Sequence, residues 1–314
     1  MSKGKPFFST YQYFLLFFSI FHALLCFFFM FLFKMVVILP FTLFFSVLLH
    51  PKTKIHNMER KYALITGASS GIGFEYAVVM AQRGYHLIII SNEEAIHDKA
   101  VELRQAHPHL DIVPFVMDLG RQEAAKELYD WCRERDYLVE VLINNAGVFH
   151  HKDFLDDSEA FNRLILNLHV HTPAMLVYYF GQDMVERHKG YILNMSSVSS
   201  NFGLQTIAAY SGTKAFLHIF SRSLHIELKH KGVYLTCVRP GAVATNLYGL
   251  RSSLLKFGVN IGVIMTPRRL ARKGVKAMFR GKCSIAPGLF TQFLKIVPYI
   301  PVCIPRLVRR LGWY

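Results

Sequence analysis

Three side chains in the stretch SSVSSNFGLQTIAAYSGTK (residues 196–214) have the chemical types and the spacing needed to move a proton. Tyr210 and Lys214 are four residues apart, so on a helix they lie on one face and can point into one pocket. A phenol ionises at about pH 10, and a nearby cation brings its pKa toward the range of a general acid or base. Ser197 follows the apolar run 192–195 and can hold a substrate carbonyl through its hydroxyl. This set predicts proton transfer to or from an oxygen while another group transfers a hydride.

A glycine-rich turn joins the first strand and the first helix that the sequence predicts. The apolar run 61–66 is followed by GASSGIG at 67–73, an amphipathic helix over about 72–83 and a second strand at 86–91. In this context the backbone N–H groups of the turn and the N-terminus of the helix bind a pyrophosphate. We therefore predict a dinucleotide-binding turn rather than an ordinary tight turn.

Strands and helices alternate along the rest of the chain as far as residue 287. The further predicted strands are 111–117, 139–143, 191–195, 233–238 and 284–287, and the predicted helices are about 93–106, 121–135, 158–185 and 208–230. This alternation predicts an α/β fold, a doubly wound parallel sheet (Rossmann fold) with helices on both faces. Thr266 and Pro267 have the residue types of an N-cap and a first helical residue, which predicts one more helix. We assign 58–287 to a single catalytic domain.

The first 57 residues differ in composition from the rest. Residues 7–33 are almost entirely apolar and aromatic, which is long enough to span a bilayer as a helix, and a shorter apolar run follows at 35–49. We predict that 1–57 is a hydrophobic membrane segment, either one span or a hairpin. Basic residues flank it on both sides, so the catalytic domain is expected to face the cytoplasm. The alternative is a start of translation at Met58, which would give a soluble enzyme without this segment.

The net charge of +15 is concentrated near the C-terminus. Residues 251–314 contain thirteen Lys and Arg and no Asp or Glu, which predicts a polyanionic partner. The aromatic, proline-containing and apolar composition of 288–314 favours membrane lipid, so we predict a basic apolar tail at the membrane interface and no nucleic acid. A solvated basic face is the alternative.

The cysteines and histidines predict neither a disulfide framework nor a metal site. The five cysteines are far apart and show no paired spacing. His169 and His171 are two residues apart and would lie on different faces of a helix. We interpret both histidines as packing or pocket-lining residues.

Several further motifs follow one another in a fixed order along the chain. They are TG-x-x-x-GIG at 66–73, Asp118, NNAG at 144–147, Asn167, Ser197, Tyr210-x-x-x-Lys214, and ProGly at 240–241 followed by Thr245. In this order and spacing, the chain from about Lys61 to Pro287 resembles the classical short-chain dehydrogenase/reductase family.

The resemblance implies a catalytic role for four residues. Tyr210 would donate its proton to the substrate oxygen, and Lys214 would bind the nicotinamide ribose and lower the pKa of the tyrosine. Ser197 would polarise the carbonyl, and Asn167 would keep a water path open to Lys214. Cofactor contacts would come from Gly67, Ser69, Ser70, Gly71, Ile72, Gly73, Ser91, Asn92, Asp118, Leu119, Asn145, Ala146, Gly147, Tyr210, Lys214, Pro240, Gly241, Val243 and Thr245.

The end of the second predicted strand bears on the choice of cofactor. Where an acidic residue would bind the ribose 2′-hydroxyl of NAD, this chain has Ser91 followed by Asn92. The carboxylate that would repel a 2′-phosphate is missing, although no arginine is present to bind it. We therefore expect NADP in preference to NAD.

The segment after Thr245 bears on the substrate, because residues 246–283 include long apolar runs that suit a hydrophobic ketone or alcohol. With the membrane segment, this layout resembles the membrane-associated branch that includes hydroxysteroid dehydrogenases and 3-ketoacyl reductases. We predict an NAD(P)-dependent oxidoreductase acting on a long-chain 3-oxoacyl, sphingoid or sterol-like carbonyl. A non-catalytic nucleotide-binding scaffold is the alternative, disfavoured because every catalytic position is filled. The resemblance also implies a homodimer through the helices at 158–185 and 208–230.

Overall fold

The computed structural model describes residues 60–245, 252–288 and 291–292. Among these residues, no helix is both long enough and apolar enough to cross a bilayer. The membrane segment predicted at 1–57 and nearly all of the predicted tail at 288–314 lie outside the described residues. Both therefore stay predictions.

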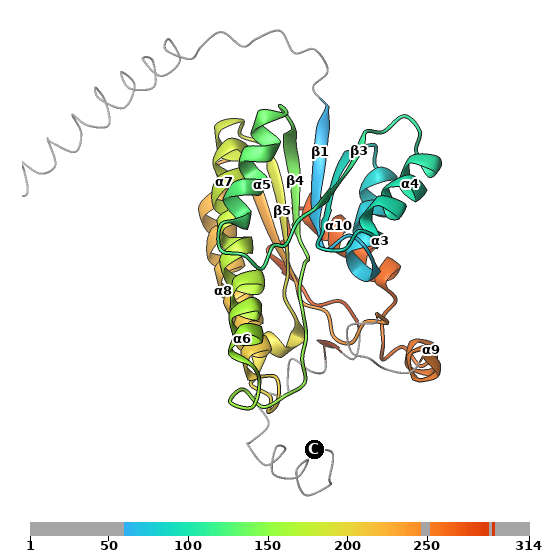
Figure 1. Cartoon of the computed structure of the whole chain (residues 1–314), viewed down its shortest axis with the longest axis vertical. Coiled ribbons are helices and arrows are strands. Elements are labelled where there is room, and N and C mark those ends of the chain that lie inside the picture. The colour runs from blue at the N-terminus through green and yellow to red at the C-terminus, as the bar shows by residue number, and fades with distance from the viewer. Residues whose placement is uncertain (1–59, 246–251, 289–290, 293–314) are drawn as a thin grey trace, which may run out of the picture. The chain divides into compact units, whose positions relative to one another are not determined.

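Seven parallel strands form one sheet in the order β3-β2-β1-β4-β5-β6-β7 (Figure 1). They are β1 (Lys61–Thr66), β2 (His86–Ser91), β3 (Ile112–Val116), β4 (Leu138–Asn144), β5 (Gly190–Met195), β6 (Val233–Val238) and β7 (Ser284–Ile285). The chain first adds strands on one side of β1 and then returns to pair β4 with its other side. The carboxyl ends of β1 and β4 thus lie at the point where strand order reverses, which is where α/β folds bind ligands.

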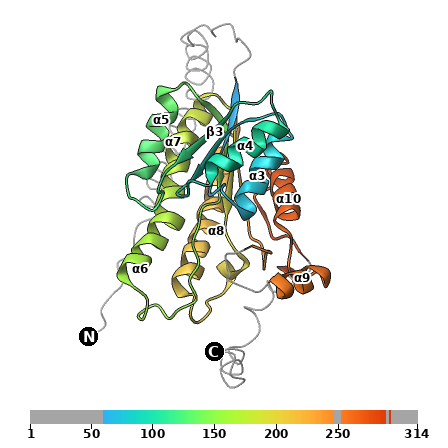
Figure 2. The ribbon, with the colours of Figure 1, turned by 45° about the vertical axis from the view of Figure 1, so that its right-hand side comes forward.

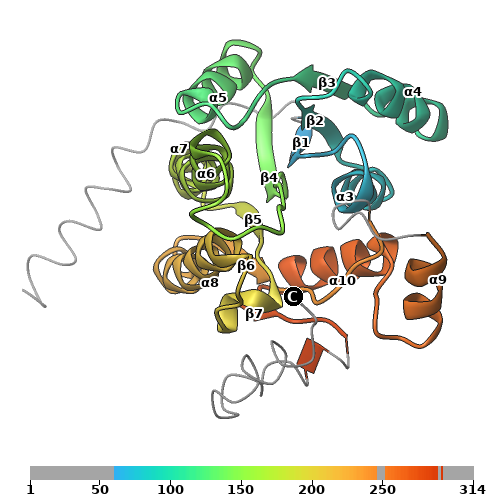
Figure 3. The same ribbon diagram turned by 60° about the horizontal axis from the view of Figure 1, so that its bottom comes forward.

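Helices cover both faces of the sheet (Figures 2 and 3). One face carries α3 (Gly71–Ala81), α4 (Ile96–Ala106) and α10 (Pro267–Phe279), and the other carries α5 (Ala124–Glu134), α7 (Thr172–Glu186) and α8 (Ala208–Lys229). Two shorter helices, α6 (Glu159–Leu166) and α9 (Ser252–Asn260), lie toward the carboxyl ends of the strands. This is the doubly wound arrangement that the alternating pattern predicts.

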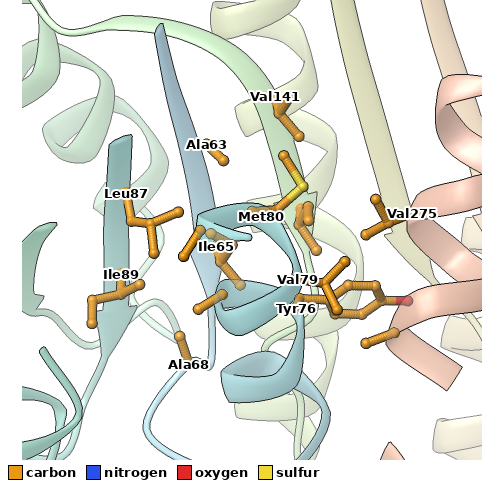
Figure 4. Close-up of a cluster of buried hydrophobic side chains, with 14 of the residues drawn as sticks. Ala63, Ile65, Ala68, Tyr76, Val79, Met80, Leu87, Ile89, Val141 and Val275 are labelled. Atoms are coloured by element: carbon orange, nitrogen blue, oxygen red, sulfur yellow. The ribbon is translucent and has the colours of Figure 1, made fainter. Parts of the chain in front are cut away.

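Each face of the sheet has its own apolar core. In β2, Ile89 belongs to the core under α3 while Ile88 and Ile90 belong to the core on the opposite face. This alternation explains why the strand is a continuous apolar run, because both of its faces are buried. Figure 4 shows the first of these cores, in which Tyr76 and Met80 of α3 pack on the sheet.

The helix predicted over 158–185 is wrong as a single element. The structure has α6, then a π-helical turn at Asn167–His171, and then α7. Pro173 has no N–H to donate at this point, and the N–H of Thr172 reaches back five residues to the carbonyl of Asn167. The helix predicted from Thr266 is confirmed, because the Thr266 side chain accepts from the N–H of Arg269 and Pro267 is the first residue of α10.

Candidate active site

A cavity of about 500 Å³ opens at the carboxyl ends of the strands, a size typical of ligand sites. Every site residue predicted from the sequence except Asn167 lines it. These residues are Gly67, Ser69, Ser70, Gly71, Ile72, Gly73, Ser91, Asn92, Asp118, Leu119, Asn145, Ala146, Gly147, Ser197, Tyr210, Lys214, Pro240, Gly241, Val243 and Thr245. The fold therefore brings motifs that are far apart in the sequence to a single cavity.

The glycine turn forms one wall of this cavity and has the features of an anion site. Gly67 and Gly71 have φ values of +65° and +55°, a backbone conformation that other residues rarely adopt. Ser70 is the N-cap of α3, and no side chain caps this helix terminus. Its first N–H groups lack intrahelical partners, so the turn fits the pyrophosphate of a dinucleotide.

Gly73 allows the backbone of α3 to approach the end of β1 closely. A Cβ built on Gly73 would lie 1.9 Å from the carbonyl oxygen of Gly67 and 2.6 Å from Nδ2 of Asn145. We expect Gly73→Ala to lower the free energy of unfolding by about 1–3 kcal/mol through overpacking, and to weaken dinucleotide binding. Urea titration and fluorescence titration with NADPH measure the two effects.

Gly181 provides the matched control for this substitution. It lies inside α7, and a Cβ there would meet nothing within 4 Å. Because alanine is the better helix former, Gly181→Ala is expected to raise the free energy of unfolding by up to about 1 kcal/mol. Equal effects of the two substitutions would contradict the close approach at Gly73.

The loop after β4 is bonded to the end of β1. The Asn145 side chain donates to the carbonyls of Thr66 and Gly67 at 3.0 and 3.2 Å. The Thr66 hydroxyl accepts from the N–H groups of Asn145 and Ala146 at 2.9 and 3.0 Å. These bonds hold the ends of β1 and β4 together at the point where strand order reverses, and so fix the backbone on this side of the cavity.

At the end of β2, the residues expected to face the cofactor ribose form a small polar network. The Ser91 hydroxyl donates to Ser69 Oγ at 3.0 Å and accepts from the N–H of Glu93 at 3.1 Å. Glu93 also lines the cavity, a position that the spacing after the second strand did not predict. A carboxylate is therefore present in this region, two residues beyond the end of the strand.

Tyr210 and Lys214 are both buried in the first turns of α8 and both line the cavity. The Lys214 ammonium lies 5.5 Å from the centroid of the Tyr210 ring and donates to the carbonyl of Met195 at 3.0 Å. Burial lowers the pKa of Lys214 to about 8, so the ammonium form still predominates at pH 7. The pair thus places a positive charge beside the phenol, as the i, i+4 spacing predicts.

Ser197 lies at the end of β5 with a defined hydrogen-bond role. Its Oγ accepts from the N–H of Ser199 at 3.2 Å and from the Ser199 hydroxyl at 3.0 Å. A hydroxyl has two acceptor positions and one donor, so both acceptor positions are used. With these two bonds made, the Ser197 O–H is available to donate to a ligand in the cavity.

His169, which the sequence predicts to be a packing or pocket-lining residue, is a further candidate for function. It is buried, lines the cavity and lies edge-on to Tyr210 with ring centroids 5.7 Å apart. Its Nε2 accepts from the N–H of Val148 at 2.9 Å, so the proton of the neutral ring is on Nδ1, which lies 3.1 Å from Thr213 Oγ1. Burial, and then the charge of Lys214, hold the pKa of His169 well below its ordinary value. The ring joins the loop after β4 to the helix that carries Tyr210.

Asn167 is the one predicted site residue that does not line the cavity. Its side chain donates to the carbonyl of Gly120 at 3.0 Å. The π-helical turn begins at this residue and directs Leu168 and His169 to the cavity instead. The role implied for Asn167 in carrying water to Lys214 stays a prediction.

Comparisons with known proteins agree with this geometry. A family model described as short chain dehydrogenase matches residues 61–253. The chain is 29% identical over 216 residues to very-long-chain 3-oxoacyl-CoA reductase-B of Danio rerio, covering 68% of this chain and 67% of that protein. It is 35% identical over 193 residues to inactive hydroxysteroid dehydrogenase-like protein 1 of Homo sapiens, covering 60% and 57%. The matched part of the chain thus spans between 57% and 67% of the length of these relatives.

Among solved structures, the chain is similar to a short-chain dehydrogenase from Sphingobium yanoikuyae in complex with NADPH. The TM-score is 0.66 at 27% sequence identity, and the match covers 73% of this chain and 88% of that one.

Proposed function

Because the chain belongs to the short-chain dehydrogenase family, whose members are oxidoreductases that bind a nicotinamide cofactor, we propose that it reduces a lipophilic ketone with NADPH. The main support for the proposal is that Ser197, Tyr210 and Lys214 line the same cavity as the glycine turn, where the N-terminus of α3 has no side-chain cap. The preferred substrate is a long-chain 3-oxoacyl derivative, which the Danio rerio relative supports by its name. Sphingoid and sterol-like ketones share the same chemistry.

The residues that would hold the cofactor are those of the glycine turn, Asn145, Lys214 and Thr245. When bound, NADPH supplies the hydride for reduction of the carbonyl. Ser197 donates a hydrogen bond to the carbonyl oxygen of the substrate and so fixes its position. Tyr210 donates its proton to that oxygen, and the Lys214 ammonium stabilises the phenolate that is left.

The cavity also has apolar walls for the substrate. Val148, Leu164, Leu168 and Met195 line it beside the polar groups, and Phe149 packs edge-on against Tyr210 with ring centroids 5.0 Å apart. Such a surface binds a hydrocarbon chain through burial of apolar area. It supports a lipophilic substrate over a sugar or a small acid.

A second candidate function is that of a non-catalytic nucleotide-binding protein. The identity to a human protein named as inactive favours it. Oxidation of NADPH by the full chain, with long-chain 3-oxoacyl-CoA as the acceptor, distinguishes the two. Turnover that depends on the acceptor supports the reductase, whereas tight NADPH binding without turnover on any lipophilic ketone would favour the non-catalytic protein.

The proposal keeps the domain arrangement, location and assembly expected from the sequence. We propose a membrane segment at 1–57, a catalytic domain at 58–287 that faces the cytoplasm, and an interfacial tail at 288–314. A homodimer through α7 and α8 is supported by exposed apolar side chains on α8, such as Ile219 and Ile226. Isolated apolar residues are common on surfaces, but several along one helix favour a protein contact.

The proposed use of NADPH, which the NADPH complex of the similar Sphingobium yanoikuyae enzyme supports, makes Glu93 a test residue. Its carboxylate would repel the 2′-phosphate of NADPH, so we expect Glu93→Gln to increase the affinity for NADPH by about threefold to tenfold and to change NADH affinity little. Fluorescence titration of both cofactors measures the ratio. Glu94→Gln is the matched control, because Glu94 is exposed and does not line the cavity. If the ratio of NADPH affinity to NADH affinity does not change in Glu93→Gln, the 2′-phosphate of NADPH does not bind near Glu93.

A further inference from the structure

Exposed apolar side chains gather at the end of the sheet where the cavity opens. Leu155, in the loop after β4, is 91% exposed, and Phe257 and Ile261 of the α9 segment are 63% and 56% exposed. Phe154 lies on the connection after β4, Leu204 on the connection after β5 and Val263 on the connection after β6, and all three are exposed. Because all strands are parallel, these connections lie at one end of the sheet. Figure 2 shows α9 and the connection before α6 at this end.

A row of cations follows α9 and its turn along the chain. Leu270, Ala271, Gly274 and Val275 bury one side of α10 against the sheet and α3. Its other side exposes Arg268, Arg269, Arg272, Lys273 and Lys276, and the helix contains no acidic residue.

The first cations of α10 are not explained by the stability of the helix. Arg268 and Arg269 lie in the first turn, where the helix dipole favours acidic residues and disfavours cations. Along the chain, Arg268 and Arg269 follow the exposed Val263 by five and six residues, so positive charge comes soon after the apolar residues of α9 and its turn. Their placement therefore favours an external anion over intramolecular stabilisation.

The same segment is bonded directly to the wall of the cavity. The N–H of Met265 donates to the carbonyl of Ala242 at 3.0 Å, and the N–H of Ala244 donates to the carbonyl of Met265 at 2.9 Å. Ala244 and its neighbour Thr245 line the cavity. The segment between α9 and α10 is thus fixed to the backbone of the cavity wall.

We propose that α9, the turn after it and the first turns of α10 form a docking surface for an anionic lipid bilayer. Phe257, Ile261 and Val263 enter the boundary between headgroups and acyl chains, while Arg268, Arg269 and Arg272 bind lipid phosphates. The cavity then opens toward the bilayer, and a lipophilic ketone reaches Tyr210 without crossing water. Delivery of the ketone to Tyr210 rests on the proposed function. Exposed aliphatic and aromatic side chains beside the cations favour a lipid surface over a nucleic acid.

Tryptophan probes in the full chain test this orientation. The chain is reconstituted with vesicles of brominated phosphatidylcholine containing about 30% phosphatidylserine, because anionic lipid is the expected partner. Bromine quenches a tryptophan only when the indole enters the acyl region, so we expect the added fluorescence of Phe257→Trp to fall by about half or more. The control is Val101→Trp, on α4 away from this surface and 48% exposed, which should not be quenched. Equal quenching of both probes, or of neither, would overturn the proposal.

Charge reversal tests the part played by the cations. In Phe257→Trp, the added changes Arg268→Glu and Arg269→Glu should reduce the quenching to the level seen with phosphatidylcholine vesicles alone. If quenching does not depend on phosphatidylserine, the assignment to anionic lipid is wrong. Binding of a labelled DNA duplex that charge reversal abolishes, without quenching at position 257, would assign the surface to nucleic acid instead. Turnover with a water-soluble ketone is measured separately, so absence of reductase activity is distinguishable from absence of docking.

Discussion

Replacing Tyr210 by phenylalanine is expected to lower kcat/KM for ketone reduction by about 10²–10⁴-fold, the usual contribution of a positioned acid or base. The ring packs edge-on against Phe149 and His169, and phenylalanine keeps these contacts. Only the hydroxyl that donates the proton is lost. NADPH affinity should therefore change by less than about threefold, so the loss appears in turnover rather than in cofactor binding.

Tyr85→Phe controls for the loss of a tyrosine hydroxyl elsewhere. The Tyr85 hydroxyl donates to Glu140 at 2.8 Å, and neither residue lines the cavity. Its removal should lower the free energy of unfolding by about 1–3 kcal/mol, because a buried carboxylate loses a donor, and leave the activity of the folded protein unchanged. A Tyr210→Phe variant that keeps more than about a tenth of the parent's kcat/KM would contradict the assignment of Tyr210 as the proton donor.

The second large effect is expected at Lys214. Replacement by methionine removes the charge beside the phenol, and we expect kcat/KM to fall by at least about 10²-fold. Methionine matches the buried length of the side chain, so the helix is expected to remain folded. A small effect on kcat/KM with unchanged NADPH affinity would argue against any role for this cation.

The pH dependence of the parent follows from the same residue. Burial lowers the pKa of Lys214 to about 8 in the folded protein, so the active ammonium form is present below that pH and is lost as pH rises through it. We expect the profile of kcat/KM, which reports the free enzyme, to fall with rising pH through about 8. Lys214→Arg keeps a cation at all these pH values and should remove this limb, even if its activity is lower.

The free energy of unfolding should rise with pH over the range in which kcat/KM falls. The unfolded chain holds the Lys214 proton up to a pH of about 10.4, whereas the folded protein releases it at about 8. Between these values the unfolded state binds more protons, so the free energy of unfolding rises with pH over this interval on account of this residue. Below pH 8 the cost of burying the ammonium applies in full. Urea titrations of the parent and of Lys214→Met at pH 7 and pH 9.5 measure this contribution, which the variant should lack.

Local sequence patterns were sufficient for most of the site because the motifs act through neighbouring backbone. The glycine turn needs only a strand before it and a helix after it, and Tyr210 and Lys214 need only one helix. Parallel strands then place every motif that follows a strand at one end of the sheet. For this reason the family could be predicted from the sequence, and all of the predicted site residues except Asn167 line the cavity.

Side-chain directions are hardest to predict where the backbone is irregular. At the π-helical turn before Pro173, the Asn167 side chain bonds to Gly120 and does not line the cavity, whereas His169, predicted as a packing or pocket-lining residue, does line it. A regular helical period cannot predict these directions. Glu93 reaches the cavity because the chain turns at Ser91, whose hydroxyl holds the N–H of Glu93, and that contact also has no signal in the spacing.

The most direct test of the account is transfer of isotope from cofactor to substrate. The full chain is incubated with NADPH deuterated at the reduced carbon of the nicotinamide and with a long-chain 3-oxoacyl-CoA, and the product is examined by mass spectrometry. We expect a 3-hydroxyacyl product that carries deuterium at the former carbonyl carbon, formed by the parent and at least about 10²-fold more slowly by Tyr210→Phe. Absence of labelled alcohol from a folded parent that binds NADPH would contradict the assignment as a reductase of this substrate.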